Sequence, residues 1–533
     1  MSEETSALLQ NGPQQEYSDQ RDGQTESQSG SHKESTPSYW VFFVPMAIGI
    51  FLPALDQTLV VSSYATIGSE LKELQKTSWI ATSYLLTITC VQPLYGKLSD
   101  IFGRKSCLLF SYTLFALGCL LCGLSRNMNE LIASRALTGI GGGGMQTIVS
   151  IIMSDVVPLR SRGTWQGVMN LVWASGNATG ASLGGYLADT IGWRWSFIIQ
   201  VPLTLLAIAS VTFALHLPNL DNANLWSKLR RVDFSGAIAL VLTMLSLLIG
   251  LDRVSNASWN DRLAIAFLSA FIVFGLAFMI IEMKVAKEPF APQRIIINRA
   301  LIASYMVNLF GLASMFCIIF HVPLFFQAVI GKTASESGLW LILSVVGSVS
   351  GSLSSGLIMQ STGKYYILTV MASTMLAVGS ITMTLSSGAW TISILGLVSG
   401  LFISSLGSGT VITTSLISLI ANAGQEDQAI AIAVSYLFRS TGSVLGVSIG
   451  SALLQDTLRS SLRAKLSGND VDEIVHRVRE SLVYLDELDP LTRSIVKISY
   501  GEAIQMAFRF SAVLAIGAWI SSLFIKEKPL SRS

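Results

Sequence analysis

Charged residues are scarce in this chain. They make up 13% of its 533 residues, against roughly 25% in a typical soluble domain. Hydrophobic residues reach 51%, and the mean hydropathy is +0.56. This composition argues against a water-soluble domain and predicts a chain that mostly faces lipid or other lipid-embedded segments. The net charge is +2, and no basic block is long enough to indicate a nucleic-acid partner.

Cysteine and histidine are also scarce, with five and four residues. The cysteines lie inside apolar runs without metal-ligand spacing to a histidine, which predicts no disulfide and no metal site. We expect them to be small packing residues. No nucleophile–base pair or phosphate-binding loop stands out, so the sequence indicates neither an enzyme nor a cofactor. The five are Cys90, Cys107, Cys119, Cys122 and Cys317.

Residues 1–38 form a polar tail rich in Gln, Ser, Glu and Gly. Such a segment cannot bury enough apolar surface to offset its ordering entropy, so we predict a disordered tail. Within it, Glu4 is followed by three spacers and the pair Leu8-Leu9. An acidic residue followed by a dileucine is typical of the adaptor-read signals that send membrane proteins to lysosomes or vacuoles.

Long apolar runs fill the rest of the chain. A helix of about 20 mostly apolar residues crosses a bilayer core, and fourteen runs meet this requirement. We therefore predict an all-α membrane protein with fourteen transmembrane helices. The runs are 40–62, 78–96, 105–124, 129–155, 163–187, 195–217, 233–251, 262–283, 299–322, 335–359, 365–385, 390–418, 427–452 and 507–525.

Lysine and arginine in the short loops set the predicted orientation. Thirteen lie in the loops on the side of residues 97–105, and seven lie on the opposite side. Basic residues accumulate on the cytoplasmic side, so both termini are predicted to be cytoplasmic. The sequon Asn256-Ala257-Ser258 falls on the other side, which makes Asn256 a candidate glycosylation site.

The loop 453–506 lies on the predicted non-cytoplasmic side. Asp489-Pro490 within it resembles an N-cap followed by a proline at the first helical position. Apolar residues at helical spacing also predict an amphipathic helix. This helix either caps a transport cavity or rests on the membrane surface, and we favour the second. Its apolar residues are Val471, Ile474, Val475, Val478, Leu482 and Leu485.

The loop between the second and third runs reads Gly-x-x-x-Asp-x-x-Gly-Arg-Lys. Gly96 and Gly103 permit close helix approach and a tight turn, and Asp100 can face the positive end of a helix. Spacing, residue types and position resemble the loop 2–3 signature of the major facilitator superfamily. The resemblance implies that Arg104 pairs with Asp155 in a charge network that gates the two halves. The alternative is a plain topological stop signal.

Two charges lie in the first and fourth runs. Asp56 is an intramembrane carboxylate, and such groups usually have a function. The pattern Leu-Asp-x-Thr-Leu-Val resembles the first span of the fourteen-span drug:proton antiporter branch, which favours a proton or cation site over a carboxylate merely bonded to Thr58 or a neighbouring helix. Arg135 opens Arg-x-x-x-Gly-x-Gly, which resembles a fourth-span motif tied to proton transfer. The alternative is an arginine that snorkels to the interface.

Span 5 carries small residues at every fourth position, which let two helices touch. The run resembles the antiporter signature of proton-driven exporters, although Ala181 replaces the usual proline and removes the expected kink. Simple helix packing is the alternative. In span 13, Arg439 lies in Phe-Arg-x-x-Gly, which resembles an element of the same branch, and it either offsets a buried acid or holds a substrate carboxylate. The span 5 glycines are Gly176, Gly180, Gly184 and Gly185.

The resemblance covers residues 40–525, and segments 55–67 and 79–86 are most similar to fungal vacuolar amino-acid transporters, those of fission yeast above all. It implies a monomer in the vacuolar membrane that exchanges luminal protons for cytosolic amino acids, mostly basic ones. It also implies six-helix bundles at 39–217 and 299–533, with two linking helices in 218–298. The partners would be amino acids, protons, membrane lipid and a sorting adaptor. The alternatives are a multidrug:proton antiporter with the same motifs and, less favoured, a non-transporting nutrient sensor.

Overall fold

The computed structural model describes residues 39–530 apart from a few short segments. Residues 1–39 form one unit and 40–533 another. The predicted tail, with Glu4, Leu8 and Leu9, lies outside the described residues. The segments left out within the second unit are 72–77, 215–232, 257–258, 286–294, 296–297, 333, 389–391, 467–472, 475–476 and 479–487.

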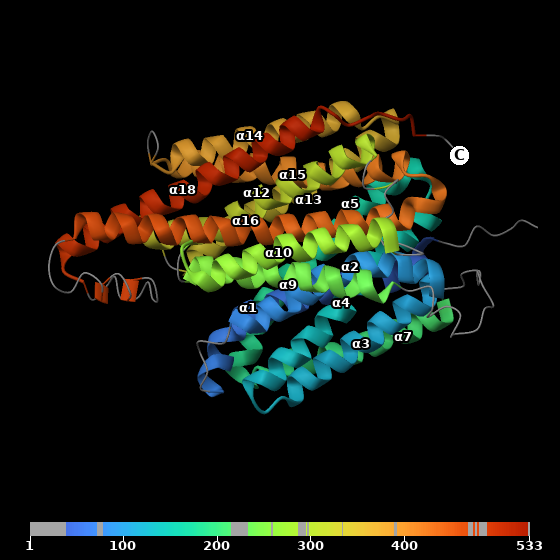
Figure 1. Ribbon diagram of the computed structural model, residues 1–533, viewed down its shortest axis with the longest axis horizontal. Coiled ribbons are helices and arrows are strands. Elements are labelled where there is room, and N and C mark those ends of the chain that lie inside the picture. The colour runs from blue at the N-terminus through green and yellow to red at the C-terminus, as the bar shows by residue number, and fades with distance from the viewer. Residues whose placement is uncertain are drawn as a thin grey trace, which may run out of the picture. The chain divides into compact units, whose positions relative to one another are not determined.

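The described chain is helical (Figure 1). Up to the linking pair, the helices are α1 (Tyr39–Glu70), α2 (Ser78–Phe102), α3 (Arg104–Leu124), α4 (Met128–Val156), α5 (Leu159–Thr190), α6 (Arg194–Ile198), α7 (Gln200–Ala214), α9 (Phe234–Asn256), α10 (Arg262–Ile280) and η2 (Ile281–Val285). They are followed by α12 (Arg299–Phe325), η3 (Phe326–Ile330), α13 (Ala334–Thr362), α14 (Tyr366–Ser386), α15 (Ile394–Asn422), η4 (Gln425–Asp427), α16 (Gln428–Lys465) and α18 (Pro490–Ser522).

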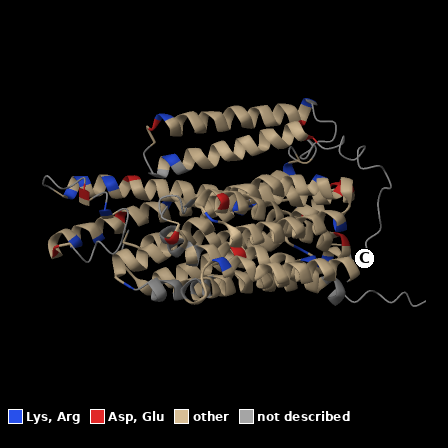
Figure 2. Ribbon diagram, turned by 90° about the horizontal axis from the view of Figure 1, so that it is seen from below, with Lys and Arg blue, Asp and Glu red and all other residues tan. Residues whose placement is uncertain are grey.

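Twelve helical stretches of the described chain are long and apolar enough to cross a membrane. Two further helices, α2 and α5, have 25 and 32 residues but a more polar composition. Figure 2 shows Lys, Arg, Asp and Glu mainly near the helix ends, with few along their middles. The all-α membrane architecture predicted from composition is therefore confirmed.

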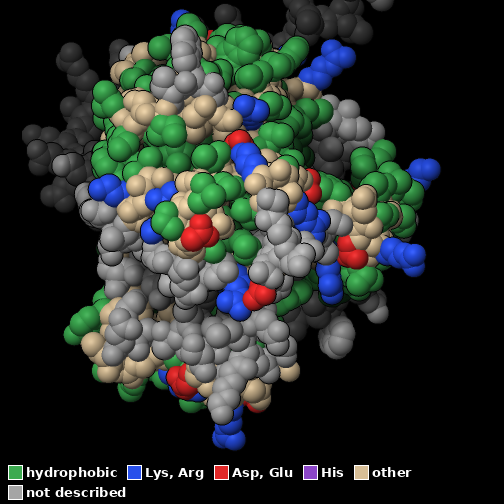
Figure 3. Space-filling model, turned by 90° about the vertical axis from the view of Figure 1, so that its left-hand side faces the viewer, with side chains coloured by type: hydrophobic (Ala, Val, Ile, Leu, Met, Phe, Trp, Pro, Cys, Tyr) green, Lys and Arg blue, Asp and Glu red, His purple; other side chains and the backbone are tan. Residues whose placement is uncertain are grey.

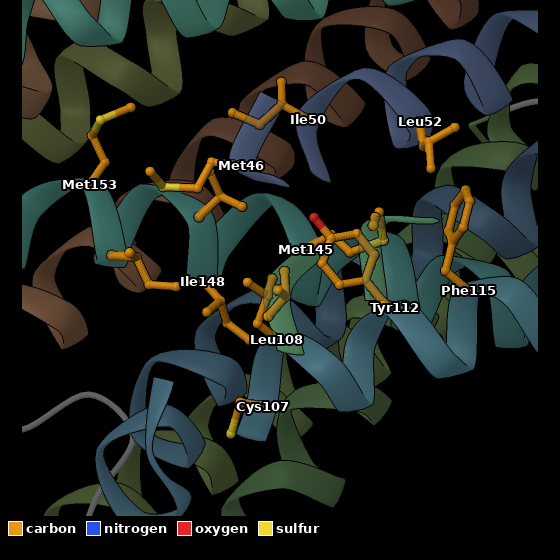
Figure 4. Packing of buried hydrophobic residues seen from close by; sticks show 14 of the residues in the cluster. Met46, Ile50, Leu52, Cys107, Leu108, Tyr112, Phe115, Met145, Ile148 and Met153 are labelled. Carbon is orange, nitrogen blue, oxygen red and sulfur yellow. The ribbon is translucent and has the colours of Figure 1, made fainter. Parts of the chain in front are cut away.

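Most packing lies within two groups, helices α1 to α7 and helices α12 to α18, and across the groups α5 packs on α13 and α2 packs on α16. Figure 4 shows one core of the first group, where Met46 of α1, Tyr112 of α3 and Met145 of α4 meet. Helices α9 and α10 pack on each other, and α9 also contacts α2 and α16. Only 6% of the residues in the membrane-length stretch of α10 are buried, so much of its apolar surface is left for lipid. The five cysteines are all buried, which agrees with a packing role.

Small residues set one repeated contact in the two groups. A Cβ atom added to any of six glycines would come within 2.0–2.7 Å of the facing helix, so larger side chains would force the helices apart. Each set of three is spaced by four residues. Gly176, Gly180 and Gly184 of α5 face Phe51, Leu55 and Leu59 of α1, and Gly442, Gly446 and Gly450 of α16 face Leu309, Ala313 and Cys317 of α12.

The last two long helices extend beyond their predicted runs. Helix α16 continues to Lys465, and α18 begins at Pro490, where the Asp489 carboxylate accepts hydrogen bonds from two backbone amides of the first turn at 3.0 and 3.1 Å. The predicted cap is therefore confirmed. Lys465 pairs with Glu502 across the two extensions at 2.6 Å. Figure 3 shows charged and hydrophobic side chains mixed on this side of the molecule.

The favoured interpretation of the segment 471–485 as a helix resting on the membrane surface is wrong for its described residues. Val478 is buried in the same apolar cluster as Leu458 and Val496, and Ile474 packs against that cluster. The Tyr500 hydroxyl also donates a hydrogen bond to the Val478 carbonyl at 2.7 Å. The described apolar residues of this segment pack against α16 and α18, because both helices continue beyond the length needed to cross a bilayer.

Candidate transport site

A buried ion pair joins α1 to α4. The Arg135 guanidinium lies 2.6 Å from the Asp56 carboxylate, and the two side chains are 1% and 0% exposed. Both residues were predicted from the sequence as site residues, but no contact between them was predicted. The structure brings them together, and Arg135 does not snorkel to an interface. Removing one member of a buried ion pair costs about 3–5 kcal/mol, because the other charge is left uncompensated.

Neighbouring elements hold both charges in place. The Gln200 side-chain amide donates hydrogen bonds to the second Asp56 oxygen at 3.1 Å and to the Ser196 carbonyl at 3.0 Å. Arg135 donates to the Ile80 carbonyl at 3.3 Å, and its guanidinium carbon lies 4.3 Å from the centre of the Tyr84 ring. The site thus draws on α1, α2, α4 and the α6–α7 junction.

Sequence reasoning missed Gln200. It lies in the sixth run, which the structure keeps as one membrane-length stretch, Arg194–Phe213, with helical backbone angles at Ile199 where α6 meets α7. The side-chain oxygen of Gln200 is buried and has no hydrogen-bond partner within the part of the chain that the structure describes. An intramembrane glutamine among apolar neighbours was the signal that could have found it.

Helix α5 fixes the position of α1 beside Asp56. A Cβ atom on Gly180 would come within 2.3 Å of the Leu55 carbonyl oxygen, so the residue before Asp56 touches the α5 backbone. The Thr58 hydroxyl donates to the Asn177 carbonyl of α5 at 2.9 Å. Helix α5 contains no proline, as the alanine at position 181 implied. Gly176 and Gly184 extend the contact, whereas the surroundings of Gly185 lie outside the described residues.

A second charge network lies at the end of the helices where α2 turns into α3, here called the Arg104 end. Arg104 contacts Asp100 at 2.5 Å and Asp155 of α4 at 3.1 Å. Gly103 makes the turn with a positive φ of 88°, which L side chains rarely adopt. A Cβ atom on Gly96 would lie 2.4 Å from that of Ala433 on α16. Asp155, the predicted partner of Arg104, is thus in place, and Asp100, predicted to face a helix end, contacts Arg104 as well.

Hydrogen bonds join the two helix groups at the Arg104 end. Arg160 of α5 donates to the carbonyls of Gln360, and of Ser361 at 2.7 Å, on α13. Ser154 of α4 donates to the Gln428 side chain of α16 at 3.3 Å. Further along the helices, Asn170 donates to Ser352 at 2.6 Å, Ser440 donates to Gln92 at 2.7 Å, and the Ser150 and Tyr436 hydroxyls lie 2.5 Å apart. The groups are therefore closed against each other from this end inward.

Arg439 has a different environment from Arg135. Its guanidinium carbon lies 4.9 Å from the centre of the Tyr436 ring, one turn earlier on α16. Among the described residues, no carboxylate lies within the 4.0 Å limit for an ion pair with it. His321, by contrast, is buried and satisfied, with Nδ1 2.7 Å from the Cys317 carbonyl. Asn256 ends α9, and the surroundings of its side chain lie outside the described residues.

Comparison with known proteins agrees with this arrangement. The sequence matches the family Major Facilitator Superfamily over residues 46–447. It is 39% identical to the vacuolar membrane amino acid uptake transporter fnx2 of Schizosaccharomyces pombe, over 93% of this chain and 86% of that protein. It is 36% identical to the multidrug resistance protein fnx1 of the same yeast, over 94% of each chain. It is 34% identical to vacuolar basic amino acid transporter 2 of Saccharomyces cerevisiae, over 82% of this chain and 95% of that protein. The chain therefore belongs to the major facilitator superfamily and is a membrane transporter.

Proposed function

We propose that the protein is a proton-coupled antiporter that moves amino acids, mainly lysine, arginine and histidine and some neutral ones, from the cytosol into the vacuole. The substrate class is supported by the names of two relatives, an amino acid uptake transporter and a basic amino acid transporter. Proton coupling is supported by one observation above all. The ion pair between Asp56 and Arg135 is fully buried, and such a pair breaks when its acid takes up a proton.

The proposed cycle uses fourteen spans: six in the bundle of residues 39–217, two linking helices in 218–298 and six in the bundle of 299–533. Ionised Asp56 holds Arg135 and ties α1 to α4. Protonation removes that attraction, so α1 can shift along α5 while the bundles rock about the substrate. The network of Arg104, Asp100 and Asp155 within the first group latches the Arg104 end, where hydrogen bonds between α4, α5, α13 and α16 join the two groups.

The proposed location is the vacuolar membrane, with both termini and the Arg104 end in the cytosol. Asn256 is then luminal and open to glycosylation, and Glu4, Leu8 and Leu9 are accessible to a sorting adaptor. The proposed unit is a monomer surrounded by lipid. In this orientation the described state is closed to the cytosol, as expected of a carrier ready to exchange solute with the lumen.

Uptake into vesicles tests the proton coupling. Purified protein is reconstituted with its luminal side inward and acidic, and radiolabelled lysine is supplied outside. The wild type should accumulate lysine while the pH gradient lasts, and Asp56→Asn should abolish this accumulation at equal protein level. Lysine accumulation that survives collapse of the gradient, or that persists undiminished in Asp56→Asn, would refute proton antiport through this residue.

A multidrug:proton antiporter is the second candidate, and the likeness to multidrug resistance protein fnx1 favours it. The same vesicles separate the two functions: the second predicts proton-driven movement of cationic dyes and none of lysine. A nutrient sensor that does not transport is distinguished by counterflow, because it would bind amino acid without exchanging labelled for unlabelled solute.

A further inference from the structure

Arg439 occupies a defined place in the repeated contact between α16 and α12. Gly442 meets Leu309 as Gly176 meets Phe51, and Gly446 meets Ala313 as Gly180 meets Leu55. The same register, three residues earlier, sets Arg439 at the place that Trp173 holds on α5. The α16–α12 contact thus has the same register as the α5–α1 contact, with Arg439 at the position that corresponds to Trp173.

The anion of the first group has no counterpart in this register. Because Ala313 takes the place of Leu55, the next residue, Ser314, takes the place of Asp56. Ser314 is buried, and its hydroxyl lies 3.4 Å from that of Ser380. In the first group Arg135 has a carboxylate built into the protein, whereas Arg439 packs against the face of Tyr436 and has no ion-paired carboxylate among the described residues. An arginine at membrane depth normally requires an anionic, carbonyl or water partner.

Arg439 also lies at the seam between the two groups. Tyr436 contacts Ser150 of α4, and Ser440 contacts Gln92 of α2. On a helix with 3.6 residues per turn, position 439 is turned by roughly 60° from 436 and roughly 100° from 440. Its side chain is only partly buried, unlike that of Arg135. The guanidinium therefore borders the surface along which the groups must part for solute to enter.

We propose that Arg439 is the carboxylate-binding residue for the transported solute, with Tyr436 orienting its guanidinium. The α-carboxylate of an amino acid would accept two parallel hydrogen bonds from the guanidinium. A lysine side chain in place of Arg439 could not reproduce this geometry. The solute thus brings the anion that the second helix group lacks, while Asp56 serves the proton in the first. This inference rests on the proposed function, because it requires a substrate that carries a carboxylate.

The test measures lysine KM and maximal rate in reconstituted vesicles. Arg439→Gln should raise KM about 10- to 100-fold, the loss expected for a hydrogen-bonded charge pair. Arg439→Lys should fall between that variant and the wild type. Arg509→Gln is the matched control, because Arg509 is exposed on α18 and donates a hydrogen bond to Gln505 one turn earlier on the same helix. The KM of this variant should be unchanged.

A second measurement needs no variant, and so decides the matter even if Arg439→Gln fails to fold. Unlabelled lysine should compete with labelled lysine on the wild type, whereas cadaverine, which is lysine without its carboxylate, should compete about 10- to 100-fold less well. Equal competition by cadaverine, or a wild-type KM in Arg439→Gln, would overturn the carboxylate site and leave amino acid transport standing. A wild type that moves no amino acid would overturn the proposed function and the site together.

Discussion

The cost of an uncompensated charge can be measured directly at the pair of Asp56 and Arg135. Asp56→Asn keeps the side chain's shape but leaves the guanidinium buried without its counter-ion. Both side chains are at most 1% exposed, so water cannot relieve the loss, and we expect about 3–5 kcal/mol of destabilisation. Arg135→Gln alone should cost a similar amount, because it leaves the carboxylate buried instead.

The double variant Asp56→Asn/Arg135→Gln removes both charges and leaves two amides that can bond each other. It should therefore be clearly more stable than the sum of the single changes implies, with a coupling of at least about 2 kcal/mol. Unfolding midpoints of the four detergent-purified proteins give this cycle. The double variant should still fail to accumulate lysine, because it has lost the proposed proton site. Additive losses of stability would refute the account of the pair as mutually compensating charges.

Three further outcomes follow. Gly180→Val should destabilise the α1–α5 contact by about 1–3 kcal/mol and lower expression, because its Cβ atom would lie 2.2 Å from the Thr58 hydroxyl. Gly424→Ala is the control, because its Cβ atom would meet nothing within 4 Å, and it should behave as wild type. Equal stability of the two variants would refute the packing role of Gly180. Asp155→Asn should weaken the ion pair with Arg104. A cysteine placed at position 433 should then react faster with a thiol reagent added on the cytosolic side. An unchanged labelling rate would contradict this. Hydrogen bonding by Arg194 lowers the pKa of Glu70 below its usual 4.5, so this pair stabilises the fold above pH 4.5 and its contribution disappears as pH falls through the lowered pKa. Glu70→Gln should accordingly be less stable than wild type near neutral pH, by no more than about 1 kcal/mol for so exposed a pair, and equally stable in strong acid; a difference that grows with acidity would contradict this.

Periodicity and composition predicted where most helices lie, because a bilayer demands long apolar stretches and the chain supplies them. They predicted the ends of α16 and α18 poorly. Beyond the bilayer the pattern turns polar, and only the contact between the two extensions, with Val478 buried against them, keeps both helical. The cap at Asp489 was visible in advance because it depends on two adjacent residues.

The sequence predicted the charged residues of the site but not the contacts between them. Asp56 and Arg135 stand out as charges within apolar runs, but 79 positions separate them, and no spacing rule joins residues so far apart. The link between Arg104 and Asp155 came from a family resemblance. Gln200 escaped notice because it is uncharged and its importance comes from a hydrogen bond to Asp56, which lies 144 positions away in the chain.

The side-chain oxygen of Gln200, which has no hydrogen-bond partner among the described residues, has a consequence for the proposed protonation of Asp56. While Asp56 is ionised, its carboxylate only accepts hydrogen bonds, and the Gln200 side-chain nitrogen donates one to it. A neutral carboxyl has one O–H donor; when that hydrogen sits on the oxygen that faces Gln200, the amide would turn over and accept it with its own oxygen. That rotation would release the Ser196 carbonyl, so protonation on the first helix would remove a hydrogen bond within the sixth span.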